Sequence, residues 1–279
     1  MKYKNCHCMS ICTEHSESQS KCRTKKNRRR SHSKQSELGL QILFGNEWHK
    51  WTYLQDQLSY VTPNYISRKV AQLGKHYFSD AQVCWDMFGG MGMDAINLAN
   101  VFNKVIVTEV DPTICEIQAN NLETLNTKSN VAAFCRDCVA ASKDPEFMEG
   151  IDVIHFDPPW GETFRTYEEF YFENVHLPGP GLPEESESSG PGINIISLLN
   201  YLYQNIPRMI LKSPIKCNSF ERWAADQVPP VNILQTCEFP THKLKYLYID
   251  KPTVQKYHDR IRSNSHTGSY SRPRRHSGL

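Results

Sequence analysis

The stretch Trp85-Asp86-Met87-Phe88-Gly89-Gly90-Met91-Gly92 decides the fold. It follows a short apolar run and precedes a segment with helical spacing, so it predicts a strand, a tight loop and a helix. Gly90 and Gly92 let the loop backbone pass close to a ligand, because side chains there would collide with it. Ala95 stands where the dinucleotide-binding fingerprint has its third glycine, so the loop alone is a weak signal.

Apolar runs and helix-spaced segments alternate on both sides of this loop. The expected strands are 82–87, 104–109, 130–135, 151–156, 207–212, 231–237 and 243–249. The expected helices lie near 65–73, 94–101, 112–125, 193–205 and 219–226. This alternation predicts an α/β, Rossmann-like fold with a mostly parallel seven-stranded sheet and helices on both faces. Ligands of such sheets bind at the carboxyl ends of the strands.

Composition divides the chain into four regions. Residues 1–36 and 251–279 are polar and basic, and we expect both tails to be disordered. Residues 37–76 form an aromatic-rich N-terminal helical lobe, which either packs on the sheet or acts as a lid. Residues 77–250 form the main domain, and 177–192 is a flexible, acidic insertion rich in proline and glycine.

The net charge of +2 hides a strong asymmetry. Residues 1–36 carry +8 and residues 251–279 carry +6, whereas the body between them carries −12. This distribution indicates an anionic polymer that is gripped by the tails. The run Lys25-Lys26-Asn27-Arg28-Arg29-Arg30 resembles a nuclear import signal or an RNA-binding arm, and the alternative is a merely solvating tail.

The cysteines and the hydropathy indicate the compartment. Ten cysteines without a signal peptide favour a reducing compartment and free thiols. No apolar run is as long as a membrane span, so we expect a soluble intracellular protein with no membrane partner. The Cys and His residues of the N-terminal tail lack paired Cys-x-x-Cys spacing, so we expect no metal.

Three acids follow three successive strands, at the expected ligand edge. Glu109 ends the second strand, where an acid binds two ribose hydroxyls, and Asp137 can accept from an adenine amine. Asp86 would repel a pyrophosphate but suits the ammonium of S-adenosylmethionine, so the loop favours that cofactor over NAD. The alternatives are structural: Asp86 caps the loop and Asp137 caps a helix at Cys138. We interpret Asp111 as a helix cap.

The corner Asp157-Pro158-Pro159-Trp160 closes an apolar strand. Two prolines fix φ and offer no N–H, so carbonyls face outward beside a carboxylate and a flat indole. Such a surface suits an exocyclic amine on a planar base, with Asp157 and the Pro158 carbonyl accepting its hydrogens. The alternative for Trp160 is a core tryptophan.

Residues from about Tyr60 to Tyr248 resemble the trimethylguanosine synthases, which are class I S-adenosylmethionine-dependent methyltransferases. The motifs that carry the resemblance are Val61-Thr62-Pro63, Asp86-x-Phe88-x-Gly90-x-Gly92, Glu109-Val110-Asp111-Pro112, Gln118-Ala-Asn-Asn121, Cys135-Arg136-Asp137, Pro158-Pro159-Trp160-Gly161 and Leu211-Lys212-Ser213-Pro214. The chain departs from the family at Gly89, where a cysteine is familiar, at Met93-Asp94, which replaces Gly-Asn, and at Asp157, where the family varies.

The resemblance implies N2-methylation of the 7-methylguanosine cap of RNA, in the nucleus and by a monomeric catalytic domain. It implies catalytic roles for Asp157, Pro158 and Trp160, with Trp160 stacking on the methylated base. The implied cofactor-binding residues are Thr62, Asp86, Phe88, Gly90, Gly92, Glu109, Val110, Asp137 and Asp157. Lys212, Pro214 and Lys216 are candidates for the capped RNA, the two lysines for its phosphates.

Two other functions remain open from the sequence. Asp-Pro-Pro-aromatic also serves methyltransferases of an internal nucleobase amine, either N6 of adenine or N2 of guanine, which flip the base out. A catalytically silent RNA-binding protein with a methyltransferase fold is the second alternative. The complete set of acids argues against it.

Overall fold

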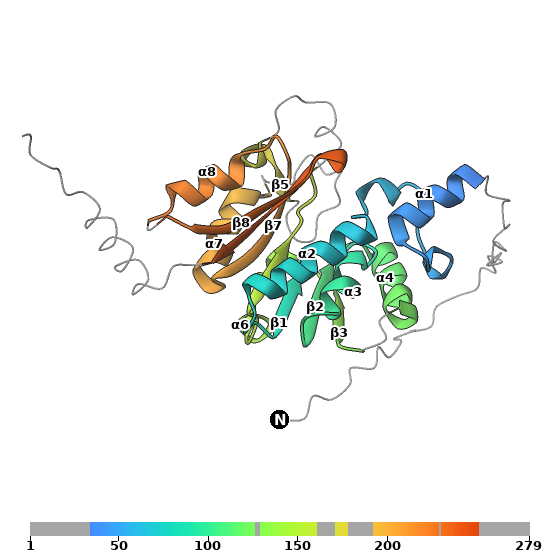
Figure 1. Ribbon diagram of the computed structural model, residues 1–279. Coiled ribbons are helices and arrows are strands. Elements are labelled where there is room, and N and C mark those ends of the chain that lie inside the picture. Colours follow the sequence, from blue (N-terminus) through green and yellow to red (C-terminus); the bar gives the residue numbers. More distant parts are fainter. Residues whose placement is uncertain (1–33, 126–128, 161–170, 178–191, 229, 251–279) are drawn as a thin grey trace, which may run out of the picture.

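The computed structural model describes residues 34–125, 129–160, 171–177, 192–228 and 230–250 (Figure 1). Residues 1–33 and 251–279, which make up nearly all of the basic tails and include the run Lys25–Arg30, lie outside the described residues, as does most of the insertion at 177–192. The last three residues of the N-terminal tail, 34–36, are helical, so the expected disorder is wrong for them.

A seven-stranded sheet forms the centre of the molecule, in the order β3-β2-β1-β4-β7-β9-β8. Its strands are β1 (Val83–Asp86), β2 (Lys104–Glu109), β3 (Val131–Cys135), β4 (Val153–Phe156), β7 (Arg208–Pro214), β8 (Asn232–Phe239) and β9 (Leu244–Asp250). The pairs from β3 to β7 are parallel, whereas β9 is antiparallel to both of its neighbours. The fold is therefore the α/β, Rossmann-like one that the sequence predicts, and the seven expected strands are confirmed.

Helices cover both faces of the sheet (Figure 1). They are α2 (Asn64–Tyr77), α3 (Met93–Ala99), α4 (Pro112–Leu125), α5 (Cys138–Ser142), α6 (Pro145–Met148), α7 (Ile195–Asn205) and α8 (Ser219–Asp226). The apolar side chains of α2 and α3 pack on one face, with part of α4, and those of α5, α7 and α8 pack on the other. Successive strand residues alternate between these two cores, which explains why the strands are apolar throughout.

The segment before α2 is partly helical and packs beside α3 and α4. It contains α1 (Lys34–Phe44) and two 3₁₀ turns, η1 (Trp48–Lys50) and η2 (Leu58–Tyr60). Its small core joins Phe44 and Trp51 to Met93 of α3. The backbone N–H of Thr52 donates to Asn121 of α4 at 2.8 Å, and the Asn121 amide donates back to the Thr52 carbonyl at 2.9 Å. These two hydrogen bonds hold the segment that leads into α2 against α4 of the main domain.

The structure adds short elements, of which the sequence indicated only the helix at Cys138. The helices α5 and α6 follow β3, and the strands β5 (His176–Leu177) and β6 (Ile193–Asn194) form a small separate sheet. Two further 3₁₀ turns are η4 (Phe172–Asn174) and η5 (Pro240–His242). The expected helix near 65–73 begins at Asn64 and continues to Tyr77. Four- and five-residue helices are too short to produce a readable hydrophobic period.

The expectation that all cysteines are free thiols is wrong for two of them. Cys115 in α4 and Cys135 at the end of β3 form a disulfide, with their Cα atoms 5.6 Å apart. The helix and the strand lie side by side at the sheet edge, a proximity that a 20-residue separation in sequence does not reveal. Cys84, Cys138, Cys217 and Cys237 are free.

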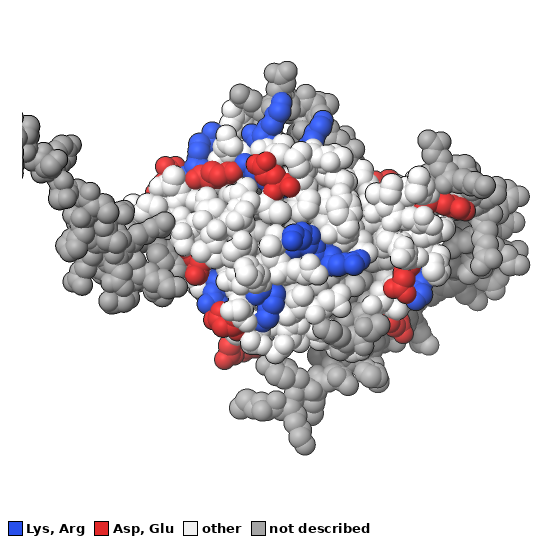
Figure 2. All heavy atoms as spheres, in the orientation of Figure 1, with Lys and Arg blue, Asp and Glu red and all other residues white. Residues whose placement is uncertain are grey.

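The surface of the described chain is mixed in character. In the residues that the structure describes, no helix combines the length and apolarity that a membrane crossing requires. On the face shown in Figure 2, acidic and basic side chains are interspersed among uncharged ones. The negative charge of the body is therefore not gathered into one block on this face.

A substitution at Gly89 would test how tightly the residues under the glycine loop are packed. A Cβ there would lie 2.1 Å from Val107 Cγ2 and 2.5 Å from Gln118 Nε2. Because Val107 is stiff and Gln118 donates to the Gly90 carbonyl at 2.8 Å, we expect Gly89→Ala to lower the free energy of unfolding by about 1–3 kcal/mol. Urea denaturation would measure this.

Gly39 in α1 provides the matched control, since a Cβ there meets nothing within 4 Å. Gly39→Ala should leave stability unchanged or raise it by up to about 1 kcal/mol, the helix propensity difference. Equal stability of the Gly89 variant and the wild type would contradict the packing described above.

Candidate functional site

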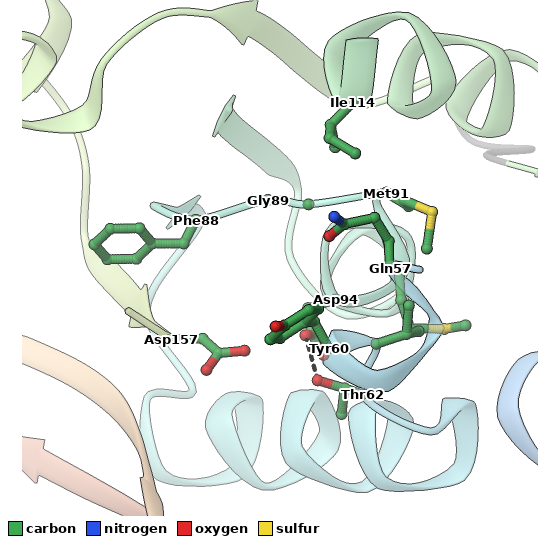
Figure 3. A pocket seen from close by; sticks show the side chains of 12 residues that line it. Gln57, Tyr60, Thr62, Phe88, Gly89, Met91, Asp94, Ile114 and Asp157 are labelled. Carbon is green, nitrogen blue, oxygen red and sulfur yellow. Dashed lines mark hydrogen bonds between the residues drawn. The ribbon is translucent and has the colours of Figure 1, made fainter. Parts of the chain in front are cut away.

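A pocket opens at the carboxyl ends of β1 and β4 (Figure 3). Its lining comes from the segment before α2, the glycine loop, the starts of α3 and α4, and the residue after β4. The lining residues are Gln57, Tyr60, Val61, Thr62, Phe88, Gly89, Gly90, Met91, Met93, Asp94, Ile114 and Asp157. In Figure 3, Asp157, Asp94 and Thr62 lie toward one side of the pocket, and Ile114 lies on the other.

The glycine loop lines the pocket with its backbone. Gly90 and Gly92 have φ of +48° and +95°, a region that favours glycine. A Cβ on Gly90 would enter open space, so the loop leaves room on that side. Glu109 at the end of β2 holds the loop, because its carboxylate accepts from the N–H groups of Gly90, Val110 and Asp111 at 2.8–3.0 Å.

Asp86 lies beneath the loop and is fully buried. Its Oδ1 is 2.9 Å from Nδ1 of His155, the residue opposite it on β4, and His155 is 1% exposed. Burial raises the pKa of Asp86. Burial alone would lower the pKa of His155, but the hydrogen bond and charge of Asp86 raise it to about 9. Asp86 and His155 therefore form a buried hydrogen-bonded pair.

A chain of polar contacts connects Asp157 to Asp94. Lys212 Nζ lies 2.5 Å from Asp157 Oδ2 and 2.8 Å from Thr62 Oγ1. Thr62 Oγ1 in turn donates to Asp94 Oδ2 at 2.9 Å, the dashed line in Figure 3. Burial raises the pKa of Asp157, and Lys212 opposes that rise.

The two prolines set the corner after β4. Pro158 is buried, Pro159 is exposed and Trp160 is half-buried, packed on the edges of both cores. Lys212 Nζ lies 5.5 Å from the centroid of the Trp160 ring. The corner therefore contributes the Asp157 carboxylate to the pocket, and its indole lies near the lysine that pairs with Asp157.

The structure brings together only some of the predicted site residues. Thr62, Phe88, Gly90 and Asp157 line the pocket, and Trp160 and Lys212 adjoin Asp157. Farther along the sheet edge are Gly92, which begins α3, Glu109, Val110, which is 61% exposed, and Asp137. Asp137 caps α5 by accepting from Ala140 N–H at 2.7 Å, which was the structural alternative for this residue. Pro214 is buried at the end of β7, and Lys216 is exposed.

Two of the predicted ligand contacts involve side chains that already have partners inside the protein, so these contacts stay predictions. Asp86 is not among the residues that line the pocket, and the sheet register places its Oδ1 against His155 beneath the glycine loop. Lys212 is 4% exposed and paired with Asp157, so its placement does not suit an RNA phosphate. Lys212 thus has internal partners, whereas Asp86 uses only Oδ1 for His155 and its buried Oδ2 has no hydrogen-bond partner.

Asp94 is the principal residue that the sequence analysis missed. It follows the glycine loop directly, in the first turn of α3, and its carboxylate lines the pocket. The available signal was an acid two residues after Gly92, where an anionic ligand would be repelled. Gln57, Tyr60, Met91 and Ile114 had no signal of their own, since their positions depend on how the N-terminal segment and α4 pack. Among the described residues no group of three His, Cys, Asp or Glu side chains could hold a metal ion.

A family model described as RNA cap guanine-N2 methyltransferase matches residues 81–180. The matched segment includes the glycine loop, Glu109 and the Asp157 corner. It covers the strands from β1 to β4, so it supports a methyltransferase on the part of the chain that builds the pocket.

Several solved structures share the fold. A protein of Porphyromonas gingivalis described as a candidate methyltransferase has a TM-score of 0.53 at 12% identity, over 77% of this chain and 48% of that chain. TrmK of M. capricolum, solved with S-adenosyl-homocysteine, has a TM-score of 0.46 at 13% identity, over 68% and 69%. An RNA methyltransferase from Salinibacter ruber, also with S-adenosyl-L-homocysteine, has 0.42 at 13%, over 69% and 95%. The similarity above a TM-score of 0.5 shows a shared α/β fold.

The buried pair under the loop gives a stability prediction. Asp86→Ala leaves His155 buried without its partner, so we expect a loss of about 3–5 kcal/mol in the free energy of unfolding. Asp80→Ala is the control, because Asp80 pairs with Arg208 at 2.9 Å but is 71% exposed. Solvent screens that exposed pair, so its loss should change the stability little. Similar losses in the two variants, measured by urea denaturation, would contradict the role of the buried pair.

Proposed function

We propose that this protein uses S-adenosylmethionine to methylate N2 of guanine in the 7-methylguanosine cap of RNA. One observation carries the proposal: Asp157, the first residue of the corner, lines the same pocket as the glycine loop. A surface suited to an amine on a flat ring therefore lies beside a loop suited to a methyl donor. The family match, which spans both features, supports this function.

The pocket has a charge that fits the cofactor. When bound, S-adenosylmethionine supplies an electrophilic methyl group on a cationic sulfur. Asp94 uses one oxygen to accept from Thr62 and lines the pocket with its carboxylate. We assign to Asp94 the contact with the cofactor's ammonium, in place of Asp86, which is buried in its pair with His155. The open space beside Gly90 leaves room for the ligand.

The remaining sheet edge fits the nucleoside part of the cofactor. Three backbone N–H groups hold the Glu109 carboxylate in one orientation. Oε1 accepts from Val110 and Asp111, whereas Oε2 accepts from Gly90 alone and keeps a lone-pair site for a ribose hydroxyl. Val110, which is 61% exposed, offers an apolar surface to a planar ring. Asp137 reaches the same edge with one oxygen engaged in its helix cap.

The corner from Asp157 to Trp160 would provide the contacts with the guanine base. The Asp157 carboxylate and the Pro158 carbonyl would accept the hydrogens of the guanine amine and hold its nitrogen toward the pocket. Such positioning can contribute about 7–11 kcal/mol to the reduction of a barrier. Stacking a cationic N7-methylated base on Trp160 adds a cation–π contribution of about 0.5–2 kcal/mol. This physical preference for a charged ring is the reason to favour the cap over an unmodified guanine.

The proposal is tested by the identity of the product. The protein is incubated with labelled S-adenosylmethionine and m7GpppA, GpppA or uncapped RNA, and the labelled nucleoside is identified. We expect label at N2 of 7-methylguanosine and none from GpppA. Label at N6 of adenine or N2 of an internal guanine would instead establish a methyltransferase of internal bases. Absence of cofactor binding in a titration would establish a silent RNA-binding protein.

Trp160 provides the substrate-side prediction. Trp160→Ala should reduce methylation of m7GpppA by at least about 10-fold, because it removes the stacking surface. Cofactor affinity, measured by calorimetry, should change little, because Trp160 is not among the residues that line the pocket. Trp160→Phe is the matched control and should retain part of the activity. Parallel loss of cofactor binding in Trp160→Ala would indicate a purely structural tryptophan.

Asp94 provides the cofactor-side prediction. Asp94→Asn should weaken S-adenosylmethionine binding by roughly 10- to 100-fold, since a hydrogen bond to a charged group contributes about 1.5–3 kcal/mol. The control is Asp226→Asn, an exposed acid of α8 outside the pocket, which should bind as the wild type does. An unchanged dissociation constant for Asp94→Asn would remove Asp94 from the cofactor site.

A further inference from the structure

Lys212 is a buried cation beside the pocket. It lies on β7, on the sheet face that α2 and α3 cover, and is 4% exposed. Its ammonium donates to Asp157 Oδ2 and to Thr62 Oγ1, and it lies 5.5 Å from the centre of the Trp160 ring. These three neighbours come from two parts of the chain, the segment before α2 and the corner from Asp157 to Trp160.

The ammonium of Lys212 has little capacity left for a phosphate. A lysine carries three N–H donors and no acceptor. Two donors are directed to Asp157 and Thr62, and the Trp160 ring lies against the cation. A phosphate ligand needs a donor that solvent can reach, which a 4% exposed side chain does not offer.

The same hydrogen bonds determine which group donates and which accepts at each step from Lys212 to Asp94. Because lysine can only donate, Thr62 Oγ1 must accept from Lys212. The hydroxyl hydrogen of Thr62 is then donated to Asp94 Oδ2. One cation thus orients Asp157 directly and Asp94 through Thr62.

The charge state of Asp157 depends on Lys212, because of the other groups that face this carboxyl. Lys212 faces it from β7, Asp94 from α3, His155 from β4 and Tyr246 from β9. Asp94 and the burial of Asp157 both favour the protonated acid, whereas Lys212 favours the carboxylate. Without Lys212, Asp157 would be a largely buried acid beside a second acid, with only His155 to offset them.

We propose that Lys212 is a positioning residue that keeps Asp157 ionised and directed toward the substrate amine, and that it is not a ligand of the RNA phosphates. The proposal rests on the proposed function, because the amine is the group that Asp157 would hold. A protonated Asp157 would present one acceptor fewer to the amine. Loss of the cation should therefore appear as a change in pH dependence.

The first experiment is a pH–rate profile with m7GpppA. In Lys212→Met the acidic limb should move up by about 1–3 pH units, because a neighbouring cation lowers a carboxyl pKa by that amount. Lys212→Arg keeps the charge and should leave the limb in place. Lys212→Met/Asp157→Asn has no carboxylic acid to titrate at this position, so the shifted limb should disappear. An unshifted limb in Lys212→Met would overturn the proposal.

A second experiment separates positioning from phosphate binding. Dissociation constants are measured for m7GMP, m7GDP and m7GTP, without cofactor. The affinity gained with each added phosphate should be the same in Lys212→Met and in the wild type. A loss that grows with the number of phosphates would assign Lys212 to the RNA phosphates instead. The exposed Lys216 provides the comparison, through Lys216→Met.

A third readout needs no substrate and so stands apart from the proposed function. In folded Lys212→Met the pKa of Asp157 should lie above its unfolded value, so the variant should lose thermal stability relative to wild type as pH rises from 5 to 8. The double variant should lack this loss. If this pattern appears while no capped substrate is methylated, the proposed function fails and the charge role of Lys212 stands. If the pattern is absent, the proposed role of Lys212 is wrong, whichever substrate the protein uses. If Lys212→Met does not fold, Lys212→Gln replaces it in each comparison.

Discussion

Compensation of buried charge is the constraint on which this site depends. Removing an ion from water costs several kcal/mol, so each charge on the covered face of the sheet needs a partner on a neighbouring strand. The strand order supplies these partners. Asp86 on β1 faces His155 on β4, and Asp157 after β4 faces Lys212 on β7. The central strand β4 therefore contributes to both pairs, and its register determines both.

These pairs leave the pocket with a definite polarity. Asp86 and Asp157 each have a cationic partner, whereas Asp94 has the neutral hydroxyl of Thr62. The uncompensated carboxylate is thus the one at the start of α3, in the lining of the pocket. A pocket of this sign favours cations, and both ligands of the proposed reaction, a sulfonium donor and an N7-methylated guanine, are cationic. The preference of the pocket for cations therefore comes from Asp94, the carboxylate whose charge is not compensated.

The sequence predicted the sheet better than the site. Long apolar strands and the helix over 112–125 have periodic patterns that survive any tertiary context, and α4 has those bounds. Contacts across the sheet have no such signal. Asp86 and His155 are 69 residues apart, and Lys212 and Asp157 are 55 apart. Recognising that these side chains satisfy one another requires the register of adjacent strands. The glycine loop and the Asp157 corner were predictable because their chemistry is local.

The bond between Lys212 and Thr62 joins residues 150 positions apart. During synthesis the acids at 86, 94 and 157 leave the ribosome well before β7, so their compensating cation arrives late. Strand β7 must also insert beside β4 and then receive β9 on its other side. Contacts of such long sequence separation form slowly. A nascent or truncated chain that ends before β7 would therefore contain the glycine loop and the corner but lack Lys212, and its acids would repel one another. Catalytic competence and completion of the sheet should therefore arise in the same step.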